Sequence, residues 1–88
     1  MLAEDLDTRR RRAAYRAAHR GTKEMDWIIG RYANEMLPRL EGEALERFER
    51  LLNLPDPALQ QWFNDPRLAA DSEFADLILE LRRFHQLE

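Results

Sequence analysis

The chain has 88 residues, a formal net charge of −3 at pH 7 and no cysteine. This length allows one domain with a single modest core, and the lack of cysteine excludes disulfides and thiolate chemistry and favours a reducing compartment. The longest apolar run, such as Trp27 to Ile29, has three residues and is too short to span a membrane. The acidic start of the chain resembles neither a signal nor a transit peptide, so a cytoplasmic protein is expected.

Helices are expected throughout, because no segment of useful length alternates with period two and the glycines and prolines fall mostly between helical patterns. The first helix is predicted to run from about Thr8 to His19, in a segment rich in arginine and alanine. Gly21 follows at the C′ position, where a helix commonly ends in the left-handed conformation. Thr22 is the expected N-cap of the second helix.

The second and third helices are predicted from apolar residues repeated every three or four positions. The stripe of the second helix ends before Pro38 and consists of Met25, Ile28, Ile29, Tyr32, Ala33, Met36 and Leu37. The third helix is expected from about Glu43 to Leu52, with four inward residues: Leu45, Phe48, Leu51 and Leu52.

Two shorter helices complete the prediction. Asp56 is the expected N-cap of the fourth helix and Pro57 its first residue. The apolar face of the fourth helix consists of Leu59, Trp62 and Phe63, with Trp62 expected in the core. Asp71 or Ser72 is expected to cap the fifth helix, whose stripe is Phe74, Leu77, Ile78, Leu81 and Phe84. The predicted fold is therefore all-α: a compact five-helix bundle in a single domain, residues 1–88.

No catalytic site is evident among these elements. The only serine, Ser72, lies at a cap position, no nucleophile–base pair can be assembled, and the isolated glycines form no phosphate-binding loop. The two histidines lie far apart without acidic neighbours at ligand spacing, so no metal site is expected. His19 is expected to bind terminal carbonyls of the first helix, and His85 to lie in a polar tail. A protein without chemistry of its own is predicted.

Four consecutive arginines, Arg9 to Arg12, are the most conspicuous charged feature. Residues 1–20 hold six arginines against three acids, whereas residues 55–88 hold three against seven. This polarity suits docking to a protein better than wrapping a polyanion, so nucleic acid is not the expected partner. The run is interpreted as a solvated helix face, partly neutralised by Glu4, Asp5 and Asp7, or as a protein-docking surface.

Arg20, Gly21 and Glu24 lie together where the first helix ends and the second begins. A helix-ending glycine, a last-turn cation and a first-turn acid account for all three structurally. The same residues would also make an exposed corner that presents a cation and an anion to a partner. Trp27 lies opposite the apolar stripe of the second helix, because each residue advances by about 100°. It meets either another helix or a partner, and the sequence favours neither.

The segment Arg20-Gly21-Thr22-Lys23-Glu24 resembles the Arg-Gly-x-x-Glu signature of the SdhE family, the succinate dehydrogenase assembly (flavinylation) factors. The resemblance covers roughly residues 12–84. It continues through Tyr15, Met25-Asp26, Phe48 to Leu52, and Asp56-Pro57-Ala58-Leu59 with Trp62. Many members have methionine after the glycine, where this chain has Thr22, which agrees with a role of Thr22 as a cap.

The resemblance implies a five-helix bundle in the bacterial cytoplasm that binds the flavoprotein subunit of succinate dehydrogenase and, in some bacteria, of fumarate reductase. It implies that the protein promotes covalent attachment of FAD to a histidine of that subunit. Since the FAD goes to the client, no stably bound cofactor is expected. Arg20, Gly21 and Glu24 would belong to the partner-binding surface, with Asp26 as a lesser candidate and Trp27 as its extension.

A small antitoxin-like or nucleic-acid-associated regulator that uses Arg9 to Arg12 is the alternative function. Its binding would weaken steeply with added salt, because it would depend on phosphate contacts. A free-standing FAD-binding protein has little support, since the sequence contains no dinucleotide-binding glycine pattern.

Overall fold

Helices account for every regular element of the computed structural model, which describes residues 5–87. Within this range there is no strand, which confirms the all-α prediction. The α-helices are α1 (Leu6–Ala18), α2 (Lys23–Met36), α3 (Gly42–Leu52), α4 (Asp56–Asn64) and α5 (Ala75–Phe84). Two 3₁₀ helices, η1 (Leu37–Arg39) and η2 (Pro66–Ala69), follow α2 and α4. Glu4, expected to neutralise the arginine run, lies outside the described residues.

A single cluster of buried apolar side chains joins the helices, and the predicted stripes supply most of it. The stripes of α2 and α3 are buried as predicted, except that Met36 is half-buried at the end of its helix. Trp62, expected in the core, is only half-buried and packs against the cluster from outside, as Phe84 does. Alanines of α1 also belong to the core, because this helix lies close against α2.

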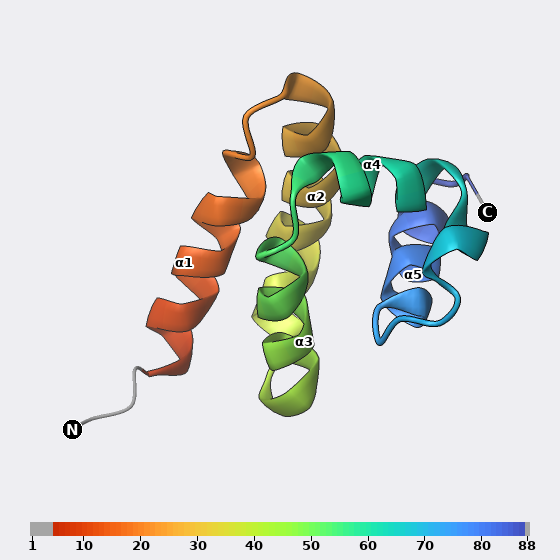
Figure 1. Ribbon diagram of the computed structural model, residues 1–88. Helices are drawn as coiled ribbons and strands as arrows, with labels where there is room; N and C mark the ends of the chain where they lie inside the picture. Colours follow the sequence, from red (N-terminus) through yellow and green to blue (C-terminus); the bar gives the residue numbers. More distant parts are fainter. Residues whose placement is uncertain (1–4, 88) are drawn as a thin grey trace.

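The helices α1, α2 and α3 lie side by side, and α4 runs across the end of the bundle where α1 passes into α2 (Figure 1). On the other side of the molecule, α5 packs against α2 and α4. Gly30 lies inside α2, whereas Gly21 lies between helices and Gly42 is the first residue of α3. At Gly30 the helix α1 crosses close to α2. A Cβ atom at Gly30 would lie 3.2 Å from the Cα atom of Ala18. The absence of a side chain thus permits the close approach of α1 and α2.

Several predicted helix ends need correction. The first helix begins at Leu6, not near Thr8, because Asp5 caps it by accepting the Thr8 N–H at 2.7 Å. It ends at Ala18 with His19 as C-cap, so Gly21 is one position beyond C′. None of the helices formed by residues 5–87 is long and apolar enough to cross a membrane.

The predicted caps of α4 and α5 are also wrong. Pro55 is the N-cap of α4 and Asp56 its first residue, and the Asp56 carboxylate binds Arg20 instead of capping the helix. Ser72 accepts the Phe74 N–H at 3.0 Å and donates to Ala69, so it stabilises the turn before α5. The N-cap position of α5 is occupied by Phe74 and not by Asp71, and the helix begins later than expected, at Ala75.

Candidate docking site

The corner between α1 and α2 is held by side chains from the start of α2. Thr22 caps this helix as predicted, and its Oγ1 accepts the Met25 N–H at 3.2 Å. One oxygen of Asp26 accepts the backbone N–H groups of Arg20, at 2.5 Å, and Gly21, at 3.3 Å. Gly21 has a φ of +119°, which only glycine adopts readily. These contacts fix the corner in one backbone conformation.

Arg20 does not present its charge to solvent, because its side chain is only 9% exposed. The guanidinium lies against the segment between α3 and α4, where its Nε donates to the Asp56 carboxylate at 2.9 Å. Its two terminal nitrogens donate to the carbonyl oxygens of Leu52, at 2.5 Å, and Leu54, at 2.6 Å. Arg20 is therefore neither a last-turn cation of α1 nor an exposed half of a charge pair.

Gly21 and Glu24 form the exposed part of the corner. A Cβ atom at Gly21 would meet no atom within 4 Å, so this glycine borders open space. Glu24 lies in the first turn of α2, where the helix dipole favours a carboxylate. Within residues 5–87 its exposed side chain has no hydrogen-bond or ion-pair partner. The Glu24 carboxylate is thus available to a cationic group of another protein.

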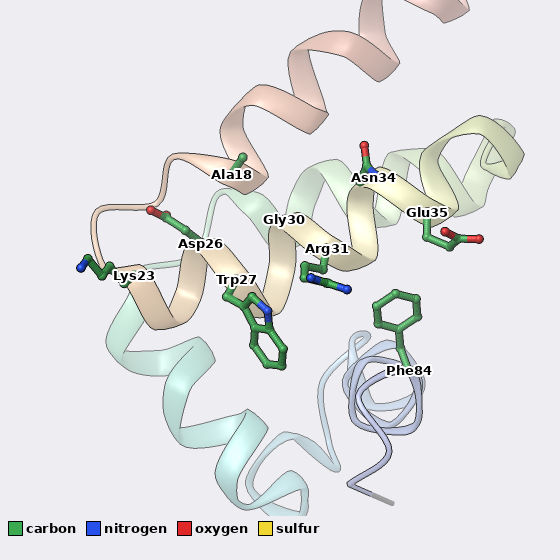
Figure 2. A pocket seen from close by; sticks show the side chains of 9 residues that line it. All are labelled: Ala18, Lys23, Asp26, Trp27, Gly30, Arg31, Asn34, Glu35 and Phe84. Atoms are coloured by element: carbon green, nitrogen blue, oxygen red, sulfur yellow. The ribbon is translucent and has the colours of Figure 1, made fainter.

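Trp27 lies at a groove of about 750 Å³ that begins beside the corner (Figure 2). Its indole projects from α2 toward α5, next to Arg31 and opposite Phe84 in Figure 2. It is 53% exposed, and the Arg31 guanidinium lies 5.9 Å from the ring centroid. The indole also packs against His85, with 4.5 Å between ring centroids. Trp27 therefore meets another part of the chain and also remains accessible to a partner.

His85 does not lie in a polar tail, and this prediction is wrong. Its Nε2 lies 2.8 Å from the carbonyl oxygen of Ile28, and its ring also packs against Phe63 and Phe84. The sequence did contain a signal, because His85 lies four residues after Leu81 and so continues the apolar stripe of α5.

His19 behaves as expected. Its Nδ1 lies 2.8 Å from the carbonyl oxygen of Tyr15, in the last turn of α1. The imidazole also stacks on the exposed Tyr15 ring, with 4.0 Å between centroids. His19 therefore stabilises the end of α1.

The arginine run is not simply a solvated face. Arg9 forms an ion pair with Glu49 of α3 at 2.5 Å, and Arg10 donates two hydrogen bonds to the carbonyl oxygen of Leu40. Arg11 follows the prediction, since it is exposed and pairs with Asp7 one turn earlier. Because Arg9 and Arg10 bind α3 and the segment after η1, the run fastens α1 to the bundle.

No group of three or more potential metal ligands occurs in residues 5–87. The partly buried Tyr32–Glu80 pair is one titratable contact of the core, in which the Tyr32 hydroxyl donates to Glu80 at 2.6 Å. Burial, the hydrogen bond and the charge of Glu80 all raise the pKa of Tyr32, so the hydroxyl stays protonated. Fold and candidate site together define a small helical protein in which a corner of fixed backbone exposes Gly21 and Glu24.

Comparison with known proteins identifies the family. The family model described as "Flavinator of succinate dehydrogenase" (Sdh5) matches residues 11–85. The chain therefore belongs to this family, which confirms the resemblance found in the sequence.

Similar proteins occur in bacteria and fungi. The "FAD assembly factor SdhE" of Acetobacter pasteurianus is 44% identical over 62 residues, which cover 69% of this chain and 57% of that protein. "Succinate dehydrogenase assembly factor 2, mitochondrial" of Cryptococcus neoformans is 37% identical over 59 residues, 67% of this chain and 34% of that protein. The protein of the same name from Yarrowia lipolytica is 36% identical over 59 residues, 67% of this chain and 41% of that protein. The matches thus span only part of each relative's length.

Proposed function

We propose that this protein binds the flavoprotein subunit of succinate dehydrogenase and promotes covalent attachment of FAD to that subunit. Membership of the flavinator family and similarity to an FAD assembly factor support this proposal. The structural observation that carries it is the exposure of Gly21 and Glu24 on a corner of fixed backbone, inside the region that the family model matches. The docking surface comprises these two residues and Trp27, while Asp26 holds the corner from within.

The proposed mechanism requires no catalytic residue in this chain. The client histidine and its FAD supply the bond-forming chemistry, because cofactors carry such steps themselves. A helper accelerates attachment if it binds the attachment-competent client conformation more tightly than the others. A difference of about 1–3 kcal/mol in binding free energy shifts such an equilibrium roughly 5- to 150-fold. A corner already fixed by Asp26 and Thr22 loses little conformational entropy on docking.

In this proposal the FAD remains with the client and is not stably bound by this chain. The site of action is the bacterial cytoplasm. The flavoprotein subunit of fumarate reductase is a second client to test beside that of succinate dehydrogenase.

The decisive experiment is in-gel flavin fluorescence of the succinate dehydrogenase flavoprotein in cells that lack this protein. Complementation with the wild type should restore the fluorescence, and Glu24→Ala should not. Glu46→Ala is the matched control, because Glu46 is also an exposed helical glutamate but lies on α3, away from the corner. Immunoblots would establish that all three proteins reach the same level.

Equal fluorescence in every strain, including the one without this protein, would overturn the proposal and favour the antitoxin-like or nucleic-acid-associated alternative. In that case, the affinity of this protein for nucleic acid should fall steeply as salt is added and should be lost when Arg11 and Arg12 are replaced by neutral residues.

A further inference from the structure

Arg20 is a signature residue that points away from the surface that the signature is expected to form. We propose that Arg20 is a positioning residue, not a partner contact, and that Asp56, its ion-pair partner, is a positioning residue as well. Together they hold the Gly21–Glu24 corner in a fixed orientation against the start of α4. This inference rests on the proposed function, since it assigns the roles of residues at the same docking site.

All three guanidinium nitrogens of Arg20 are already used inside the protein. They donate to the carboxylate of Asp56 and to the carbonyl oxygens of Leu52 and Leu54, at 2.5–2.9 Å. A partner carboxylate would have to break these bonds to reach the guanidinium, because the Arg20 side chain is 9% exposed. Its planar fork of donors suits several fixed acceptors at once, which a lysine ammonium does not reproduce.

The electrostatics of the helix ends favour this arrangement. Leu52 is the last residue of α3, so its carbonyl has no partner within the helix and lies at the negative end of the helix dipole. Asp56 is the first residue of α4, at the positive end of that helix. The Arg20 cation lies between them, and Asp56 is itself only 19% exposed. The site is therefore satisfied without any group from another protein.

The backbone of Arg20 is held as firmly as its side chain. Its N–H donates to Asp26 of α2, while its guanidinium binds the segment from α3 to α4. This one residue therefore connects the corner to α2 on one side and to α4 on the other. Beside it lies a depression of about 290 Å³. One wall consists of Thr22, the N-cap of α2, and Met25 of α2, and the other of three α4 residues, Asp56, Pro57 and Gln60. The relative position of its two walls depends on the Arg20–Asp56 contact.

The Arg20–Asp56 contact also joins two motifs that lie far apart in the sequence. The Arg-Gly-x-x-Glu segment and the Asp56-Pro57 segment contain residues 36 positions apart that meet in this ion pair. The Asp56-Pro57 segment thereby acquires a role in docking although Asp56 itself does not face the partner.

The test measures the affinity of the purified succinate dehydrogenase flavoprotein subunit for wild type, Arg20→Lys, Asp56→Asn and the double variant. Circular dichroism would first establish that each is folded at the temperature used. Each single variant should weaken binding of the flavoprotein about tenfold, because each disrupts the Arg20–Asp56 contact. Since both substitutions disrupt the same contact, the double variant should bind no more than about twofold more weakly than the weaker-binding of the two single variants. Glu49→Gln is the matched control: it breaks the Arg9–Glu49 ion pair between α1 and α3, away from the corner, and should leave the affinity unchanged.

Amide hydrogen exchange would test whether the Arg20–Asp56 contact holds the backbone of the corner in place. In Asp56→Asn, the amides of Arg20 and Gly21 should exchange faster than in wild type, although Asp56 does not bind them.

Three outcomes would count against the inference. Unchanged affinity of Asp56→Asn, with Arg20→Lys weakened, would make Arg20 a direct contact and overturn it. Additive losses in the double variant would overturn it in the same way. Failure of the wild type to bind the flavoprotein at all would overturn the proposed function and this inference together.

Discussion

The imidazole of His85 packs on the indole of Trp27, with 4.5 Å between ring centroids, and its Nε2 lies 2.8 Å from the carbonyl oxygen of Ile28. Because a carbonyl oxygen only accepts, Nε2 carries the proton in this contact. The residue after α5 thus returns to α2 and covers part of the tryptophan in the candidate docking site. A residue near the C-terminus thereby contributes to the candidate docking site, although Gly21 and Glu24 of that site lie in the first third of the sequence.

Replacing His85 with alanine should expose Trp27 further, since the indole loses part of its cover. In a Trp62→Phe background, which leaves Trp27 as the only tryptophan, acrylamide should quench the fluorescence more strongly in His85→Ala than in the parent. His19→Ala is the control, because His19 stacks on Tyr15 instead and should leave the quenching unchanged. Equal quenching in His85→Ala and its parent would contradict the packing described above.

Gly21→Ala should reduce the free energy of unfolding by about 1–3 kcal/mol, because a φ of +119° strains any residue with a Cβ atom. Gly21→Arg should reduce the free energy of unfolding by about the same amount, since the added side chain enters open space. The two variants should differ in flavin attachment to the client. Gly21→Arg should abolish the attachment because its side chain is bulky, whereas Gly21→Ala should largely retain it. Urea unfolding and in-gel flavin fluorescence measure the two effects.

Gly42→Arg provides the control for Gly21, because Gly42 also has a positive φ, +56°, and open space beside it but lies at the start of α3. It should lose stability and keep flavin attachment. Full attachment with a folded Gly21→Arg variant would refute the role given to the corner.

Gly30→Leu should lower the free energy of unfolding by about 1–3 kcal/mol, because a side chain forced into a packed contact displaces the backbone. The atom in the way is the Cα of Ala18, which lies 3.2 Å from the place that a Cβ atom of residue 30 would take, and backbone cannot rotate aside as a side chain does. Glu35→Leu, on the exposed side of α2, should change stability by less than about 0.5 kcal/mol. Urea unfolding of both variants tests this, and equal stability would mean that α1 and α2 do not cross closely at Gly30.

Stability should fall as the pH rises above 10, because burial and the neighbouring Glu80 raise the pKa of Tyr32 above its ordinary value of 10.0. The unfolded chain then loses this proton at a lower pH than the folded protein. The stabilisation is therefore complete below pH 10 and is lost as the pH rises toward the folded-state pKa. Tyr32→Phe should flatten this alkaline decline, measured as urea midpoints between about pH 8 and 11.

Tyr15→Phe is the control for the alkaline decline, since Tyr15 is exposed on α1, and it should leave the decline in place. The chain contains only two tyrosines and one lysine, so few other groups titrate in this window. An unchanged decline in Tyr32→Phe would show that Tyr32 does not cause it.

Sequence periodicity predicted the helices well because each apolar stripe depends only on neighbours three or four residues away. The inward residues of α2 and α3 follow directly from that repeat, and Thr22 caps α2 through a contact within its own turn. The predicted cap of α4 failed because a distant partner competes for the Asp56 side chain. Asp56-Pro57 has the local pattern of a cap, yet Arg20 holds the Asp56 carboxylate from 36 residues away.

The site shows the same division. The sequence by itself determined the all-helical fold, the position of the corner and the family resemblance, because these depend on local repeats and on short motifs. Only the tertiary structure decided which members of the motif face outward: Gly21 and Glu24 are exposed, whereas Arg20 turns inward and His85 comes to lie on Trp27. The physical reason is that hydrogen bonds and ring contacts between distant segments fix the direction of a side chain, and no spacing along the chain records them.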